Sequence, residues 1–190
     1  MKNTKWAGLS ILLMSGAANA SFVPVFSNTA PGPATNTTFN YALVFNTAQV
    51  SGQAFERLDS GDFVTIYDIP GFVSATAPPL FTVATQLLGV NGFGTAPSDD
   101  PVLPNVTFTY TGSSLTTNTT FVGGAIVSNF SGTGVDNFTS EDTHNLAPLA
   151  GQPIGQIGFV TVPAGGGVVP EPSILGLGAF GALTLLRRRN

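Results

Sequence analysis

Short runs of β-branched and aromatic residues alternate with turn residues along most of the chain. Phe39–Phe45 and Val106–Tyr110 place large apolar side chains at every second position, the period of a strand with one buried face. Further strand candidates are Phe22–Phe26, Ala54–Leu58, Phe63–Ile69, Leu80–Val90, Thr119–Phe130 and Gly155–Val162. Gly89, Gly92 and Gly94 predict a loop, and Ala96–Pro104 is a further turn region. With no good amphipathic helix among these segments, the pattern predicts an all-β fold, a single antiparallel β-sandwich of jelly-roll or immunoglobulin-like type.

Turn residues add detail to this prediction. Asp59–Asp62 is a short polar loop with a glycine between two strand candidates, so a hairpin is expected there. Pro24 places the first strand at a sheet edge, because proline cannot donate a ladder hydrogen bond. Gly123 and Gly124 predict a bulge or bend. Ser131–Pro148 is the most polar stretch and is expected to be a loop.

The N-terminus has the pattern of a signal peptide. Two lysines lie within the first five residues, and the apolar stretch that follows ends in a small-x-small sequence at Ala18 and Ala20. Cleavage by signal peptidase after Ala20 would leave Ser21 as the first residue. We therefore expect residues 1–20 to be removed on export.

The C-terminus combines three features in a fixed order. They are the sequence Val169, Pro170, Glu171, Pro172, then an uncharged apolar run from Ile174 to Leu186, then the basic cluster Arg187, Arg188, Arg189. The prolines keep the chain before the run extended. As a helix the 13-residue run is roughly 20 Å long, which is short for a bilayer but is helped by arginine side chains that reach the headgroups. This predicts a short C-terminal transmembrane helix whose basic end stays in the cytoplasm.

This order of parts resembles the PEP-CTERM sorting signal of bacterial envelope and secreted proteins. The resemblance implies that Pro170, Glu171 and Pro172 are recognised by an exosortase-type membrane protease. It also implies a membrane-anchored precursor that reaches the cell surface or the extracellular space, with an exopolysaccharide matrix as a candidate partner. The expected organisation is a signal peptide (1–20), a β-sandwich ectodomain (21–163), a glycine-rich linker (164–169) and a sorting signal (170–189).

Charge and cysteine content limit the partners. Between Ser21 and Val169 the only lysine or arginine is Arg57, against nine acidic residues, so the exported part carries a net charge of about −8. Such a surface is not expected to bind nucleic acid or anionic lipid. The chain contains no cysteine, so packing alone must stabilise the fold in an oxidising compartment.

Candidate chemistry is sparse, and we predict no catalytic residue, no cofactor and no metal site. His144 is the only histidine and is expected to be a solvated side chain. Glu56 or Glu141 could pair with an aspartate as in a glycosidase, but the spacing selects no pair. The acidic stretch 132–145 leaves weak calcium binding open as an alternative to a solvated loop.

Two functional hypotheses follow. The first is a non-enzymatic structural or adhesive protein of the cell surface or its matrix. The second is a secreted carbohydrate-binding or carbohydrate-active domain, which would need exposed aromatic rings. Tyr41, Tyr67 and Tyr110 could supply such rings, but their positions in strands suit core residues equally well.

Overall fold

The computed structural model describes residues 21–165, and this part of the chain is all-β. Its strands are β1 (Ser21–Pro31), β2 (Thr37–Asn46), β3 (Gln49–Val50), β4 (Gln53–Ala54), β5 (Glu56–Arg57), β6 (Phe63–Ile66), β7 (Phe72–Thr76), β8 (Phe81–Gln86), β9 (Asn105–Tyr110), β10 (Thr119–Ser128), β11 (Gly132–His144) and β12 (Pro153–Ala164). All the pairings among these strands are antiparallel. The all-β, antiparallel part of the prediction is confirmed. The predicted signal peptide and sorting signal lie outside the described residues.

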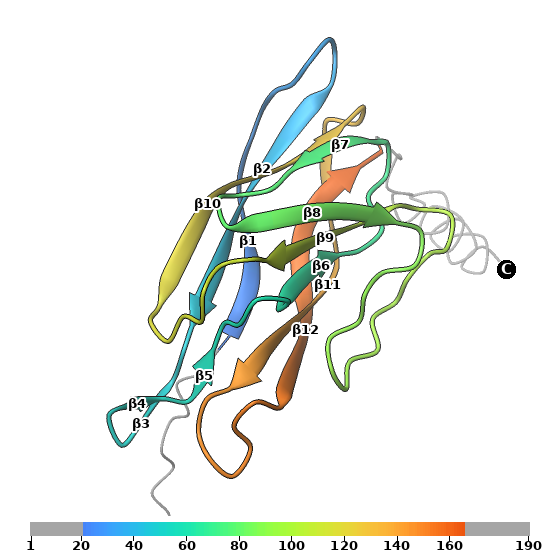
Figure 1. Ribbon diagram of the computed structural model, residues 1–190. Helices are drawn as coiled ribbons and strands as arrows, with labels where there is room; N and C mark the ends of the chain where they lie inside the picture. The colour runs from blue at the N-terminus through green and yellow to red at the C-terminus, as the bar shows by residue number, and fades with distance from the viewer. Residues whose placement is uncertain (1–20, 166–190) are drawn as a thin grey trace, which may run out of the picture.

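Two sheets pack on one shared core (Figure 1). The four-stranded sheet has the order β1-β2-β10-β7, and the six-stranded sheet has the order β12-β11-β6-β9-β8, with β5 paired to β11. The hydroxyl of Tyr41 in β2 donates a 2.9 Å hydrogen bond to the carbonyl of Thr161 in β12 and so joins the two sheets. β1 lies at the edge of its sheet, as Pro24 predicted.

Period-two alternation correctly identified the inner face of β2 and β9. Phe39, Tyr41, Leu43 and Phe45 are all buried, and Val106 and Phe108 pack in the same core. β-Branched and aromatic residues suit these positions because they pack well on a pleated surface with one buried side.

The predicted bulge is present too, because the β10–β2 register shifts between Val122 and Gly124.

The predicted hairpin around Asp59–Asp62 is wrong. β5 and β6 do not pair with each other; both pair with β11, through Thr143↔Arg57 and through Glu141↔Phe63. The two short strands therefore follow one line along β11, and the residues between them bulge out of that line. The side chain of Asp62 accepts a hydrogen bond from the amide of Asp59, which closes the bulge locally without reversing the chain.

The predicted polar loop Ser131–Pro148 is also wrong over most of its length. Residues 132–144 form β11, which pairs with β12 along its whole length and with β5 and β6 on its other side. Polar residues are tolerated here because β11 lies inside a sheet, where its backbone groups are hydrogen bonded on both sides. Low hydrophobicity misled the prediction, since strand formation was decided by pairing with distant segments.

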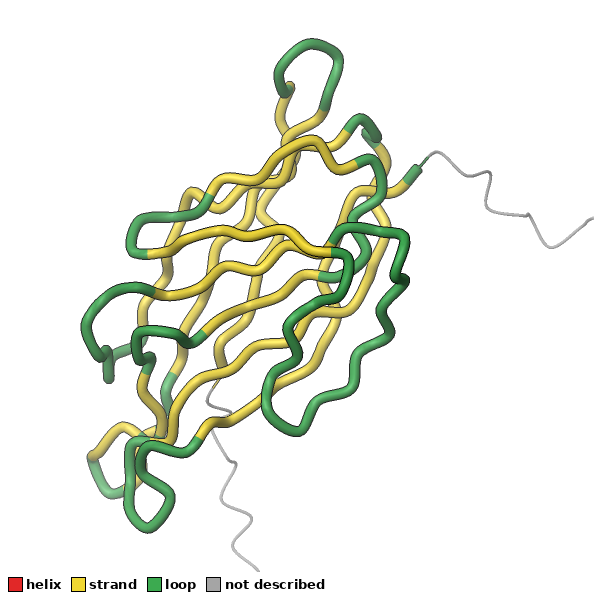
Figure 2. Tube along the Cα trace, turned by 45° about the vertical axis from the view of Figure 1, so that its right-hand side comes forward, coloured by secondary structure: helices red, strands yellow, loops and turns green. Residues whose placement is uncertain are grey.

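The loop of residues 87–104 covers the outer face of the six-stranded sheet, on the right in Figure 2. The hydroxyl of Tyr67, next to β6, lies 2.9 Å from the carbonyl of Val90 and 3.0 Å from the hydroxyl of Thr139. Asp99 accepts hydrogen bonds from the Gly89 amide and from the Asn105 side chain, at 2.9 Å each. The loop is thus tied to the sheet by specific polar contacts, and the threonines beneath it are buried.

Candidate functional site

Four exposed apolar side chains gather along the outer face of β12, and we call them the β12 surface. They are Phe93, Val135, Ile157 and Phe159. Ile157 and Phe159 are two residues apart on β12 and therefore point to the same side of the sheet. Val135 lies on the neighbouring strand, diagonal to Phe159 in the β11–β12 register. Phe159 is the most exposed of the four, at 74%.

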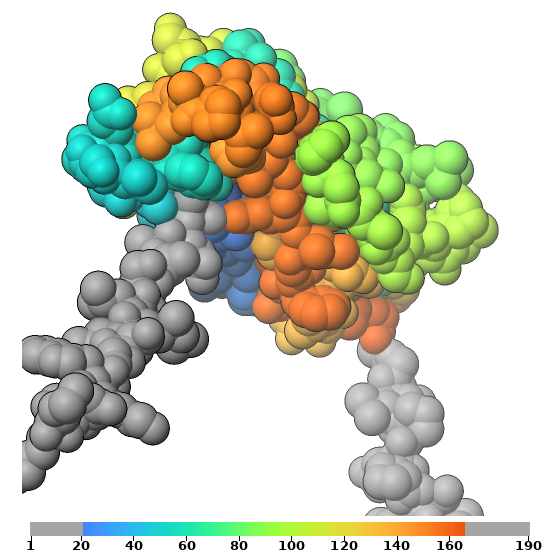
Figure 3. Space-filling model, turned by 90° about the horizontal axis from the view of Figure 1, so that it is seen from below, coloured from blue at the N-terminus to red at the C-terminus, as the bar shows by residue number. Residues whose placement is uncertain are grey.

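Phe93 reaches this surface because its loop packs directly on β12. A β-carbon at Gly155 would lie 2.0 Å from the carbonyl oxygen of Phe93, so the loop backbone passes where a side chain would otherwise be. The Phe93 amide donates a 2.9 Å hydrogen bond to Glu141, the residue opposite Gly155. Figure 3 shows the loop and β12 side by side, in yellow-green and orange. The β12 surface is therefore built from one strand pair and one loop held against it.

The tyrosines considered for a carbohydrate platform do not lie on this surface. Tyr41, Tyr67 and Tyr110 are all buried. Their hydroxyl groups make hydrogen bonds inside the fold, Tyr110 for example to the carbonyl of Ser113 at 2.8 Å. The exposed aromatic rings are instead phenylalanines, among them Phe93 and Phe159.

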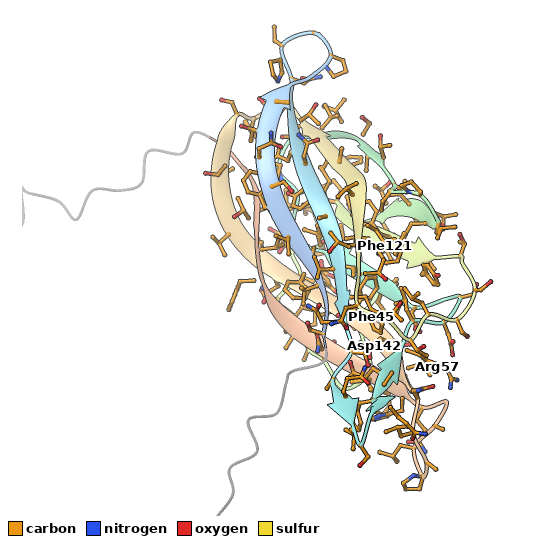
Figure 4. All side chains as sticks on the ribbon, turned by 90° about the vertical axis from the view of Figure 1, so that its left-hand side faces the viewer. Phe45, Arg57, Phe121 and Asp142 are labelled. Carbon is orange, nitrogen blue, oxygen red and sulfur yellow. The ribbon has the colours of Figure 1, made fainter. Side chains whose placement is uncertain are left out.

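A buried carboxyl cluster lies at one end of the core, and sequence reasoning did not assemble it. It consists of Glu56 from β5, Asp62 just before β6, and Asp142 from β11, which are 4%, 7% and 1% exposed. Asp142 lies four residues after Phe138 on β11, so strand alternation turns it toward the core. Figure 4 shows Asp142, Phe45 and Arg57 toward the same, lower end of the domain.

The hydrogen bonding of this cluster is incomplete. Asp62 accepts a hydrogen bond from the Asp59 amide at 2.6 Å and another from the Thr143 hydroxyl at 3.2 Å. Both side-chain oxygens of Asp142 and one of Glu56 have no hydrogen-bond partner. Arg57 does not compensate them, because its Nε lies 2.7 Å from Asp59. A buried carboxylate without a partner is costly, so this end of the core favours protonated carboxyl groups.

Burial raises the pKa of all three carboxyl groups. Loss of solvation raises the pKa of Asp62 to about 7. Loss of solvation also raises the pKa of Glu56 and of Asp142, and the negative charges of Glu56 and Asp62 raise that of Asp142 further. When both are ionised, Glu56 and Asp142 are acceptors only and cannot form a hydrogen bond with each other. When one of them carries a proton, it can donate a hydrogen bond to the other.

The other residues singled out in the sequence are not brought together. His144, at the end of β11, makes an edge-to-face contact with Phe55 at 5.3 Å between ring centroids. Glu141 and Asp142 are neighbours on a strand and so face opposite sides of the sheet. Among residues 21–165, no three histidine or acidic side chains are grouped so that they could hold a metal ion. The acidic loop that the calcium alternative assumed is a strand.

The predicted processing sites fall at or beyond the ends of the described part. Ser21 is the first residue of β1, while Ala18 and Ala20 lie outside the described residues. The sorting motif around Glu171, the apolar run Ile174–Leu186 and the three arginines lie outside them as well. Within residues 21–165, no helix is long and apolar enough to cross a membrane.

Compared with protein-family models, with curated proteins and with solved structures, the chain matches none. The structure shows that residues 21–165 form an all-β domain of antiparallel sheets, with an exposed apolar surface and a buried carboxyl cluster.

The carboxyl cluster had a usable signal in the sequence. Phe138, Ser140 and Asp142 occur at every second position, so interpreting this stretch as a strand would have placed all three on the inner face. Its overall polarity concealed that alternation. No local pattern in the sequence indicated that Glu56 belongs to the cluster, because β5 is only two residues long and pairs with β11, which is distant in the sequence.

Proposed function

We propose that the chain is an exported, non-catalytic protein of structural or adhesive type, located at the bacterial cell surface or in the extracellular matrix. The β12 surface is its contact surface. The observation that carries this proposal is the gathering of Phe93, Val135, Ile157 and Phe159 on one face, because contiguous exposed apolar residues mark interaction sites.

The proposed fold type is a β-sandwich of jelly-roll or immunoglobulin-like kind. Its support is the shared core between two sheets and the repeated crossing of the chain from one to the other, as between β6 and β7 and between β9 and β10. Such crossings are typical of Greek-key sandwiches. A rigid sandwich with contact residues on one sheet suits a passive surface module.

The proposed processing follows from the two ends of the sequence. Signal peptidase cleaves after Ala20, and the apolar run 174–186 then holds the precursor in the cytoplasmic membrane. An exosortase-type protease recognises Pro170, Glu171 and Pro172 and releases the domain to the cell surface or the medium. Exopolysaccharide of the matrix is the proposed partner there, and nucleic acid is not.

Replacing Glu171 tests the sorting part of this proposal. We expect a Glu171→Ala variant to remain full-length and membrane-bound in the native host, because the recognised motif has lost its only charge. The wild-type protein should begin at Ser21 and lack the arginine end. Intact mass measurement of fractionated cells reports both cleavages at once. A Ser173→Ala variant is the control, and release of the Glu171 variant at the wild-type rate would show that the tail is a plain membrane anchor.

A second candidate function, carbohydrate binding, is favoured by one observation. The rings of Phe93 and Phe159 are exposed on the same surface, and aromatic rings can stack against the apolar faces of sugars. This hypothesis uses the same β12 surface, with a carbohydrate as its ligand.

Replacing Phe159 distinguishes the candidates. We expect Phe159→Ala to lower the affinity of the protein for its matrix by about five- to tenfold, since an exposed aromatic anchor contributes on the order of 1 kcal/mol. Val122→Ala is a matched control, because Val122 is an exposed apolar residue of the other sheet. Binding to a panel of polysaccharides, lost in Phe159→Ala alone, would assign carbohydrate recognition. Equal binding by both variants to host matrix would exclude the β12 surface as the contact site.

A further inference from the structure

The carboxyl cluster lies where a small part of the domain, anchored at its far end by buried Leu58 and its backbone pairing with Leu115, meets β11. Residues 47–58, which we call the β3–β5 lobe, contain the two-residue strands β3, β4 and β5. The lobe pairs with β11 through only two residue pairs, Glu56↔His144 and Arg57↔Thr143. Two hydrogen bonds from Asn145, to the carbonyls of Phe55 and Ala54, add to this contact at 2.9 Å each.

Glu56 is the side chain that the lobe inserts beneath the core. Its backbone is fixed by the Thr47 hydroxyl, which donates to the Glu56 carbonyl at 2.9 Å and accepts from the Glu56 amide at 3.1 Å. Because Glu56 pairs with His144, Asp142 is its diagonal neighbour on the same face of the sheet, and burial keeps the Glu56 carboxyl group there rather than in solvent. Because Asp142 belongs to a strand paired on both sides, the lobe is the part that can move.

The charges around this contact are almost all negative. Glu56 comes from the lobe, and Asp59 and Asp62 come from the bulge before β6. Asp142 comes from β11, and Glu141 lies on the opposite face of that strand. Arg57 is engaged with Asp59, and His144 packs against Phe55. Within the described residues, no other basic side chain is available to neutralise a second ionised carboxyl group here.

We propose that Glu56 and Asp142 form a proton-operated latch, closed while one proton bridges the two carboxyl groups and open when both are ionised, so that rising pH releases the β3–β5 lobe from β11. Two observations carry it: the burial of both groups, and the lack of a hydrogen-bond partner for both oxygens of Asp142 and one oxygen of Glu56. The latch is independent of the β12 surface, which lies on the outer face of the six-stranded sheet.

The direction of the pH effect follows from the raised pKa values. A solvated carboxyl group ionises near pH 4, whereas the closed latch keeps its proton to a higher pH. The closed state is therefore fully stable below about pH 4 and loses stability as the pH rises through the raised pKa values. Each pH unit across this window changes the closed-to-open ratio by up to about tenfold for each proton released.

Hydrogen exchange of the full-length protein tests the latch. After correction for intrinsic exchange rates, amides of residues 47–58 should exchange at least about tenfold faster at about pH 9 than at about pH 5. Amides of β2 should change far less. In Asp142→Asn the difference should fall below about twofold, because an amide can donate to Glu56 without a titrating proton.

Two further variants keep the test decisive. Glu56→Gln removes the other carboxyl group of the pair and should also abolish the difference in lobe exchange between the two pH values. This variant provides the test if Asp142→Asn fails to fold. Asp136→Asn removes one negative charge from the same strand and should behave like wild type. Equal exchange of the lobe at both pH values, or undiminished opening in both Glu56→Gln and Asp142→Asn, would overturn the latch. Closure of the wild-type lobe by Ca²⁺ at alkaline pH would overturn it as well, in favour of a cation site.

Discussion

A Phe45→Ala variant should lose about 3 to 5 kcal/mol of unfolding free energy, the usual cost of removing a buried phenylalanine ring. Phe45 is fully buried in β2 and packs edge-to-face on Phe22 of β1, with ring centroids 6.3 Å apart. Its removal leaves a cavity between the sheets that a close-packed core fills only in part. Urea unfolding followed by circular dichroism measures the loss.

The matched control for this prediction is Phe159→Ala. It deletes the same ring from an exposed position of β12, so the unfolding free energy should change by no more than about 0.5 kcal/mol. A comparable loss in both variants would mean that Phe159 is buried and that the β12 surface does not exist as described.

A Gly155→Ala variant should detach the 87–104 loop from β12. The new methyl group would overlap the carbonyl oxygen and the amide nitrogen of Phe93, at 2.0 and 2.6 Å. Because both are backbone atoms, no side-chain rotation relieves the clash, and the loop must move away. We expect a loss of about 1 to 3 kcal/mol, together with faster proteolysis and hydrogen exchange within the loop.

Gly134→Ala provides the comparison for Gly155→Ala. Its methyl group would lie 3.2 Å from the β-carbon of Ala164, a milder contact between side chains of β11 and β12. The loop should stay in place in this variant. Unchanged loop exchange in Gly155→Ala, measured beside it, would contradict the packing of Phe93 over β12. Loss of matrix binding in Gly155→Ala would link the loop to the β12 surface.

The acidic residues of the domain have two different structural roles. Asp99 accepts hydrogen bonds that hold the loop, and Asp68 accepts one from the Asp100 amide at 2.8 Å. Glu56 and Asp142 are buried without such donors. The acidic side chains therefore serve as hydrogen-bond acceptors at the loop end of the domain, whereas negative charge destabilises the end beneath the β3–β5 lobe.

The sequence alone determined the features that depend on local pattern. Alternation of Phe39, Tyr41, Leu43 and Phe45 identified the inner face of β2, because a strand must bury one side and that requirement is visible at period two. The proline in β1 marked an edge, and the paired glycines marked the bulge of β10. The same local reasoning supplied the predicted export and sorting segments, which lie outside the described residues.

Tertiary structure decided which strands pair and what their polar residues do. The tight turn at Asp59–Asp62 is local, but whether β5 and β6 pair with each other or with β11 depends on a strand about 80 residues further along the chain. Because β11 is paired on both sides, its polar residues can form a strand, and that strand carries Asp142 into the core opposite the lobe. The carboxyl cluster and the β12 surface both arise from such distant contacts, whose energies no single segment of the sequence records.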